Sequence, residues 1–193
     1  ALARSRLTRY PDDIDALTAL ATVYWRRALH EDAAEVLERI ADLCEKRGDV
    51  IDAAQARCGI AVALAKEAPE RAIRALESAL SLRRRLPGAL RFLATLQGEA
   101  GDWSAALQTR ERLLATEEDP ARRREQLLAL GRTAIIEAGD PQTGSVYFQR
   151  VLDGFPDDVD GLVGFAEAQD KLGQPLRALR ALDRAGRLLQ ERG

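Results

Sequence analysis

The sequence has 193 residues, enough for one or two compact domains or for one elongated array of repeats. Hydrophobic residues make up 46% and aromatic residues 5%, so small aliphatic side chains must form the core. The abundance of alanine, leucine, arginine and glutamate is typical of an all-helical protein. The net charge of −2 gives no basic excess for a nucleic-acid backbone, and no apolar run approaches the roughly 20 residues that span a bilayer. We therefore expect neither nucleic-acid binding nor membrane insertion by this segment.

The expected helices come in pairs that glycine and proline separate. Residues 1–10 look like the second helix of a truncated preceding repeat, and Tyr10-Pro11 ends that helix because proline cannot continue it. In the next pair, over 13–28 and 31–46, apolar residues follow the i, i+3, i+4, i+7 spacing of an amphipathic helix. We expect five full repeats after the partial helix, at 11–47, 48–86, 87–118, 119–156 and 157–193.

A small residue recurs at one place in the second helix of every pair, at Ala33, Ala72, Ala106, Gly144 and Ala178. The successive intervals are 39, 34, 38 and 34 residues, so long and short repeats alternate. In the first helices of repeats two and four, Gly59 and Gly131 fit the matching small position only if one residue is inserted, which leaves that register open by one residue. The extra residues lengthen either the second helices of repeats one and three or the first helices of repeats two and four.

This pattern resembles the tetratricopeptide repeat (TPR) family, in which a large residue, Leu-Gly or Leu-Ala, Tyr, Ala, Phe and Pro stand at fixed offsets over 34 residues. The residues that carry the resemblance are Leu17, Leu20-Ala21, Tyr24, Ala33 and Leu37 in repeat one, Gly144, Phe148 and Pro156 in repeat four, and Leu162, Phe165-Ala166, Ala178, Leu182 and Ala185 in repeat five. The resemblance covers essentially the whole chain. It implies an all-α, right-handed superhelical solenoid of about five helix-turn-helix repeats, with residues 1–193 as a single solenoid.

Side chains suited to catalysis or metal binding are few. Cys44 and Cys58 form neither a disulfide framework nor a metal site, and we expect buried free thiols. The single histidine, His30, lies at a turn, where a surface or capping role is expected. Glycine-rich phosphate loops are absent, and acidic pairs such as Asp157-Asp158 fall where helices begin. We therefore expect no enzyme activity, no cofactor and no metal.

Two arginine runs, Arg83-Arg84-Arg85 and Arg122-Arg123-Arg124, stand at helix ends. The first suits the negative end of a helix dipole, and acidic residues surround the second. We interpret both as solvated faces or intramolecular ion pairs. The alternative is a nucleic-acid patch, but no aromatic residues interleave with the arginines to stack on bases.

The resemblance implies a concave groove, lined by the first helices, that binds an extended peptide or a helix of a partner protein. On the family's positions the groove residues are Asp15, Thr18, Thr22, Trp25, Arg91, Thr95, Arg132, Glu167 and Asp170. The Lys and Asn clamp by which some members hold acidic tails is absent from these positions. Trp25 stands out, because an exposed tryptophan is costly unless it binds something. The alternative is that Trp25 packs on a preceding repeat or on its own second helix.

The function we predict is a non-catalytic protein–protein interaction scaffold. The alternatives are a regulatory or sensory module that controls a linked effector domain, and homo-oligomerisation through uncapped ends. Only three basic residues are lysine, a bias that we attribute to a GC-rich, bacterial genome. Because the chain lacks methionine and opens within a repeat, we expect it to be a piece of a longer protein. Its location stays open between the cytoplasm, which is favoured, and the periplasm or envelope.

Overall fold

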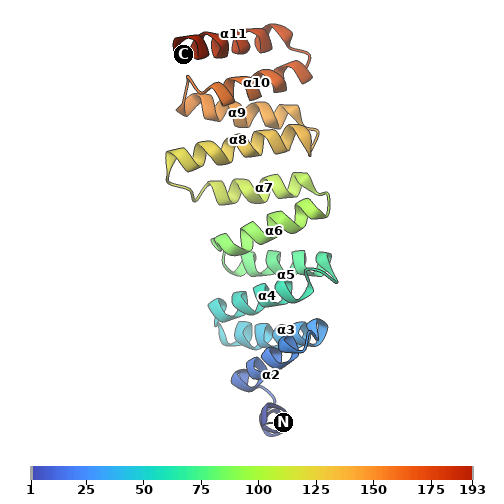
Figure 1. Cartoon of the computed structure of the whole chain (residues 1–193). Helices are drawn as coiled ribbons and strands as arrows, with labels where there is room; N and C mark the ends of the chain where they lie inside the picture. The colour runs from blue at the N-terminus through green and yellow to red at the C-terminus, as the bar shows by residue number, and fades with distance from the viewer. Residues whose placement is uncertain (1, 193) are drawn as a thin grey trace. The chain divides into compact units, whose positions relative to one another are not determined.

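The computed structural model describes residues 2–192, which form eleven α-helices and no strand. Short turns join each helix to the next along the chain (Figure 1). Their bounds are α1 Leu2–Arg9, α2 Ile14–Arg26, α3 His30–Arg47, α4 Val50–Leu64, α5 Pro69–Leu82, α6 Pro87–Glu99, α7 Trp103–Leu114, α8 Pro120–Ile136, α9 Pro141–Gly154, α10 Val159–Lys171 and α11 Pro175–Arg192.

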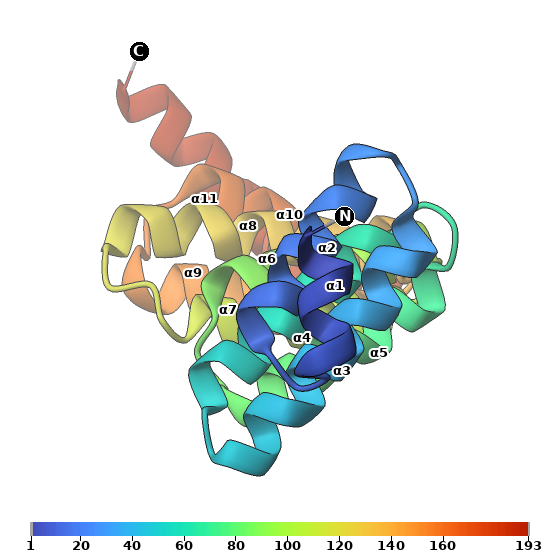
Figure 2. The ribbon, with the colours of Figure 1, turned by 90° about the horizontal axis from the view of Figure 1, so that it is seen from below.

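The chain divides into two compact units, the N-terminal unit of residues 1–100 and the C-terminal unit of residues 101–193. In the N-terminal unit, each helix from α1 to α6 packs on the next one along the chain, and Figure 2 shows α1 beside α2. In the C-terminal unit the same holds from α7 to α11, and α10 also reaches α8. This packing of each helix on its chain neighbours is that of an all-α helical-repeat solenoid, as expected.

Proline and aspartate set where the helices begin. Proline is the first residue of α5, α6, α8, α9 and α11, where its missing N–H costs no hydrogen bond. The carboxylate of Asp13 accepts a hydrogen bond from the Ala16 amide at 3.0 Å, and that of Asp158 accepts one from Gly161 at 2.7 Å. Both aspartates therefore cap the helix that follows them, as suits acidic residues at the start of a helix.

The turns within repeats three, four and five depend on left-handed glycines. Gly101, Gly139 and Gly173 have φ angles of 78°, 62° and 70°, which glycine adopts without steric cost. Each stands five residues before the recurring small residue of its repeat. In repeat one that position holds Ala28, whose φ of 55° places a Cβ in a region that L-residues avoid.

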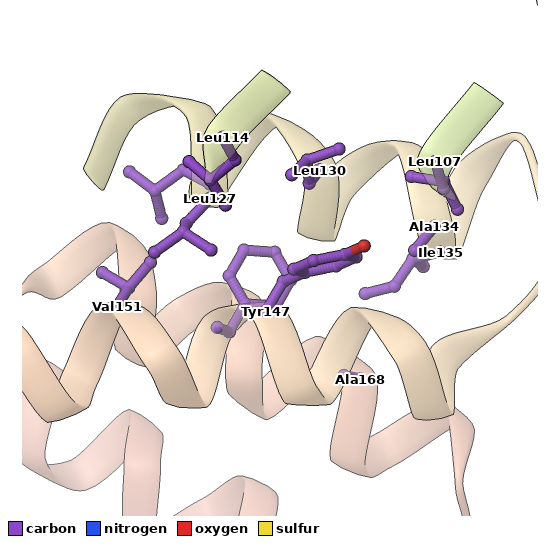
Figure 3. Close-up of a cluster of buried hydrophobic side chains, with 11 residues drawn as sticks. Leu107, Leu114, Leu127, Leu130, Ala134, Ile135, Tyr147, Val151 and Ala168 are labelled. Atoms are coloured by element: carbon purple, nitrogen blue, oxygen red, sulfur yellow. The ribbon is translucent and has the colours of Figure 1, made fainter. Parts of the chain in front are cut away.

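The small residues predicted to face each other in repeat four do meet. A Cβ built on Gly144 would lie 3.1 Å from the carbonyl oxygen of Gly131 and 2.5 Å from Cγ1 of Ile135. The helices α8 and α9 can approach this closely only because both positions lack a side chain. Around this contact lies the core of the C-terminal unit (Figure 3), which includes Leu107, Leu114, Leu127, Leu130, Ala134, Tyr147, Val151 and Ala168.

The helix lengths show where the long repeats place their extra residues. In the first long interval, both α3 with 18 residues and α4 with 15 exceed the 13 residues of α2. In the second, α8 has 17 residues whereas α7 has only 12, so the first helix alone is lengthened there. The two long repeats are therefore not built alike.

Candidate functional site

An apolar groove of about 360 Å³ runs between α2, α3 and α4 in the N-terminal unit. We call it the Trp25 groove. None of the residues that line it is charged, and they are Thr18, Ala21, Thr22, Trp25, Ala33, Leu37, Gly59 and Val62. Its volume is within the range of pockets that bind ligands.

Trp25 forms one wall of this groove and keeps 43% of its surface exposed. Its ring meets that of His30, the first residue of α3, edge-on, with centroids 5.2 Å apart and planes at 73°. Such an edge-to-face contact favours this orientation of the indole. Trp25 therefore contacts the second helix of its own repeat and still offers a large apolar surface to solvent.

The threonines and the glycine of the groove keep it apolar. The hydroxyl of Thr18 donates to the carbonyl of Ile14 at 2.8 Å, and that of Thr22 donates to the carbonyl of Thr18 at 2.9 Å. Both donors are thus satisfied within α2 and need no partner from a ligand. Gly59 leaves the floor open, since a Cβ there would lie 3.1 Å from Cδ1 of Leu37.

A second apolar cavity of about 390 Å³ adjoins the groove, between α4, α5 and α6. We call it the Phe92 cavity. Val62 lines both hollows and is 51% exposed, so the two hollows adjoin at its side chain. Cys58 also lines the Phe92 cavity, and partial burial raises the pKa of its thiol. The expectation of buried thiols holds for Cys44 but only half for Cys58.

No family model and no curated protein matches this sequence. Solved structures do match its fold. "YrrB: a TPR protein with an unusual peptide-binding site" is 17% identical, with a TM-score of 0.52, over 97% of this chain and 92% of its own. A MamA double mutant is 14% identical, with a TM-score of 0.52, over 93% of this chain and 96% of its own. MamA from Desulfovibrio magneticus is 15% identical, with a TM-score of 0.50, over 92% and 96%.

The chain has the tetratricopeptide-repeat fold. The pattern of large and small residues along the sequence indicated this fold, and the solved TPR structures confirm it. At these levels of identity the likeness concerns the fold alone. The function of this chain must therefore be inferred from its own side chains.

The structure brings together three of the predicted groove residues, Thr18, Thr22 and Trp25, in the Trp25 groove. Asp15 lies instead in a polar hollow with Arg6, Asp12 and Arg47. The other predicted residues are exposed but line neither the Trp25 groove nor the Phe92 cavity: Arg91 and Thr95 on α6, Arg132 on α8, and Glu167 and Asp170 on α10.

Sequence reasoning missed the residues that complete the groove, chiefly Leu37, Gly59 and Val62. In the sequence, Leu37 carried the family resemblance of repeat one, and Gly59 fitted the small position in the first helix of repeat two. The signal that could have revealed Val62 is an exposed β-branched residue three positions after Gly59, on the same face of α4. The open register of α4 concealed that signal.

No catalytic constellation accompanies the groove. His30 packs against Trp25, and no group of three or more His, Cys, Asp or Glu side chains within residues 2–192 could hold a metal ion. In the same part of the chain, no helix combines the length and apolarity that a membrane crossing requires. What the site offers is shape and apolar surface, which suits binding.

Proposed function

We propose that this chain is a non-catalytic protein-interaction scaffold whose Trp25 groove binds an apolar stretch of a partner polypeptide. The observation that carries the proposal is Trp25, a large aromatic residue held in place yet 43% exposed, on the wall of an uncharged groove. Tryptophan is among the residues most enriched at energetic centres of protein interfaces. The peptide-binding site named for YrrB, a structure of the same fold, is consistent with such a role.

The proposal is tested with peptides selected against the purified chain from a phage-displayed random library. We expect the selected peptides to be rich in apolar residues, and Trp25→Ala to weaken their binding about tenfold or more, measured by fluorescence anisotropy. The matched control is Val23→Ala, because Val23 is on the same helix, is also 43% exposed and does not line the groove. Selection of no peptide, or equal losses in the two variants, would contradict the proposal.

Gly59→Ala separates loss of the groove from loss of the fold. The new methyl group would occupy the groove floor, and the flexible end of Leu37 needs to yield by only a few tenths of an ångström. Alanine favours helix over glycine by about 1 kcal/mol, so the variant should be at least as stable as the parent. We expect weaker peptide binding without loss of stability.

A second candidate function is self-association through α11. Four leucines of this helix, Leu176, Leu179, Leu182 and Leu189, are exposed. A second copy of the chain could cover them. Sedimentation velocity over a range of concentrations tests this, with the Leu179→Glu/Leu182→Glu variant expected to abolish any dimer. A parent chain that stays monomeric at high concentration would exclude this candidate.

A further inference from the structure

The Phe92 cavity adjoins the Trp25 groove at Val62 and differs from it in charge. Its walls are mostly apolar, from Ile51, Cys58 and Val62 on α4 to Leu76 on α5 and Phe92 on α6. The single charged residue among those that line it is Arg83. No acidic side chain lines either hollow.

Arg83 begins a run of three arginines in the loop between α5 and α6, and Arg83, Arg84 and Arg85 are all exposed. Within the part of the chain that the structure describes, no carboxylate lies within ion-pair distance of these three guanidinium groups. The other arginine run differs, since Arg124 pairs with Asp158 and Asp160 and Arg122 lies 3.7 Å from Asp119. The first run is thus a solvated face and the second forms intramolecular ion pairs through Arg122 and Arg124, and both outcomes are among those expected from the sequence.

The start of α6 contributes positive electrostatic potential, whereas the end of α5, which directly precedes Arg83, contributes negative potential. Gly88 and Ala89, in its first turn, line the Phe92 cavity, and no side chain caps this helix at Leu86. The positive end of the α6 dipole therefore stands beside the arginines. An apolar hollow with such a rim favours a ligand that combines apolar side chains with negative charge.

We propose that the partner segment bound in the Trp25 groove continues across Val62 into the Phe92 cavity, and that it is acidic. The occupant is an amphipathic segment of another protein. Its apolar side chains fill both hollows, and its Asp and Glu side chains pair with Arg83, Arg84 and Arg85. This inference rests on the proposed function and adds the chemical class of the partner.

A second copy of this chain does not fit that description. Four of its five exposed leucines within residues 5–191 are on α11, which also carries Arg177, Arg180, Arg184 and Arg187 against only Asp183 and Glu191 within residues 175–191. Docking of this basic helix beside Arg83, Arg84 and Arg85 would bring like charges together, which is unfavourable at an interface. A nucleic acid would supply negative charge but not the apolar side chains that the two hollows accommodate.

Each hollow contains its own reporter. With Trp103→Phe, Trp25 becomes the sole tryptophan and its fluorescence reports on the Trp25 groove. Cys58 reports on the Phe92 cavity through its rate of alkylation by iodoacetamide, because the other thiol, Cys44, is buried. Since burial raises the pKa of Cys58, the reaction is run near pH 9, where more of the thiolate is present.

The probes are three short amphipathic peptides with leucines at helical spacing and with Glu, Gln or Lys at every polar position. We expect the Glu peptide to change Trp25 fluorescence, to protect Cys58, and to bind about tenfold more tightly than the Lys peptide at low salt. The Arg83→Glu/Arg84→Glu variant should remove this preference. The control with the same change of charge, Arg122→Glu/Arg123→Glu, should retain it.

The two reporters distinguish the failure of this inference from that of the proposed function. If all three peptides change Trp25 fluorescence equally and leave Cys58 unprotected, the groove binds but the acidic partner is wrong. If no peptide affects Trp25, both proposals fail. A single-stranded oligothymidylate that protects Cys58 where the Glu peptide does not would overturn the inference in favour of nucleic acid.

Discussion

The contact between Phe148 and two glycines gives the sharpest test of the packing. The tip of the Phe148 ring lies between Gly131 of α8 and Gly164 of α10, and the side chain is only 1% exposed. A Cβ on Gly131 would stand 2.7 Å from Cζ of the ring, and one on Gly164 would stand 2.7 Å from Cδ1 and closer still to Cε1 and Cζ. Real Cβ atoms essentially never approach other heavy atoms within 3.0 Å.

Gly164→Ala should therefore destabilise the C-terminal unit. The exchange favours helix by about 1 kcal/mol, whereas overpacking of a core costs about 1–3 kcal/mol. The upper end applies because Gly131 is close to the same ring atoms, and the ring cannot avoid a new methyl group freely. The net loss in free energy of unfolding is then about 2 kcal/mol.

Gly186→Ala is the matched control, because Gly186 is inside α11 and nothing lies within 4 Å of its added Cβ. It should gain up to about 1 kcal/mol. Urea unfolding is followed by Trp103 fluorescence in a Trp25→Phe background, so that the signal comes from the C-terminal unit. Equal stability of the two alanine variants would refute the packing argument, and Phe148→Leu should partly rescue Gly164→Ala if the clash is real.

Three further predictions concern single residues. Ala28→Gly should stabilise the chain by about 1 kcal/mol in thermal or urea unfolding, because it removes a Cβ from a left-handed turn. Asp140→Ala should cost about 1 kcal/mol as a lost cap. Hydrogen bonds from Thr143 lower the pKa of Asp140 in the folded chain. The stability that the ionised Asp140 contributes is therefore fully present at neutral pH, and it should be lost as the pH falls below the ordinary pKa of 3.8 and through the lowered pKa of the folded chain. The urea midpoint, measured against pH, tests this loss. Burial is the larger and the nearby Glu111 charge the smaller cause that raises the pKa of the Tyr147 hydroxyl. Above about pH 10 the unfolded chain loses this proton more readily than the folded chain, so the free energy of unfolding should fall. Tyr147→Phe should reduce that fall.

Local chemistry made the helix boundaries predictable from the sequence. Proline at a first helical position, aspartate before a helix and glycine at a left-handed turn each act through the backbone within a few residues. The turns at Gly101, Gly139 and Gly173 and the caps Asp13 and Asp158 all followed from such signals. The TPR fold could be predicted because these signals recur at nearly constant spacing.

The candidate site could be predicted only in part, because it depends on contacts between repeats. Thr18, Thr22 and Trp25 were found since repeat one keeps the regular register. Val62 was missed because α4 belongs to a long repeat. The Phe92 cavity was missed entirely, because the groove prediction included Arg91 and not Phe92. Phe92 is the next residue of α6 and therefore lies on another face of this helix.

The two long repeats show why pattern alone cannot resolve this. Each residue of an α-helix is rotated about 100° from the one before it, so one inserted residue turns every later side chain to another face. In repeat four, Gly131 still lies against Gly144, and the regular contact between paired helices is kept. In repeat two, the atoms nearest to a Cβ on Gly59 belong to Leu37 of the preceding repeat. Gly59 thereby becomes the floor of the Trp25 groove, and Val62, on the same face, is left exposed between two apolar hollows. The groove thus arises at the repeat that departs from the regular register, where packing rather than periodicity decides which small residue joins two helices and which opens a binding surface.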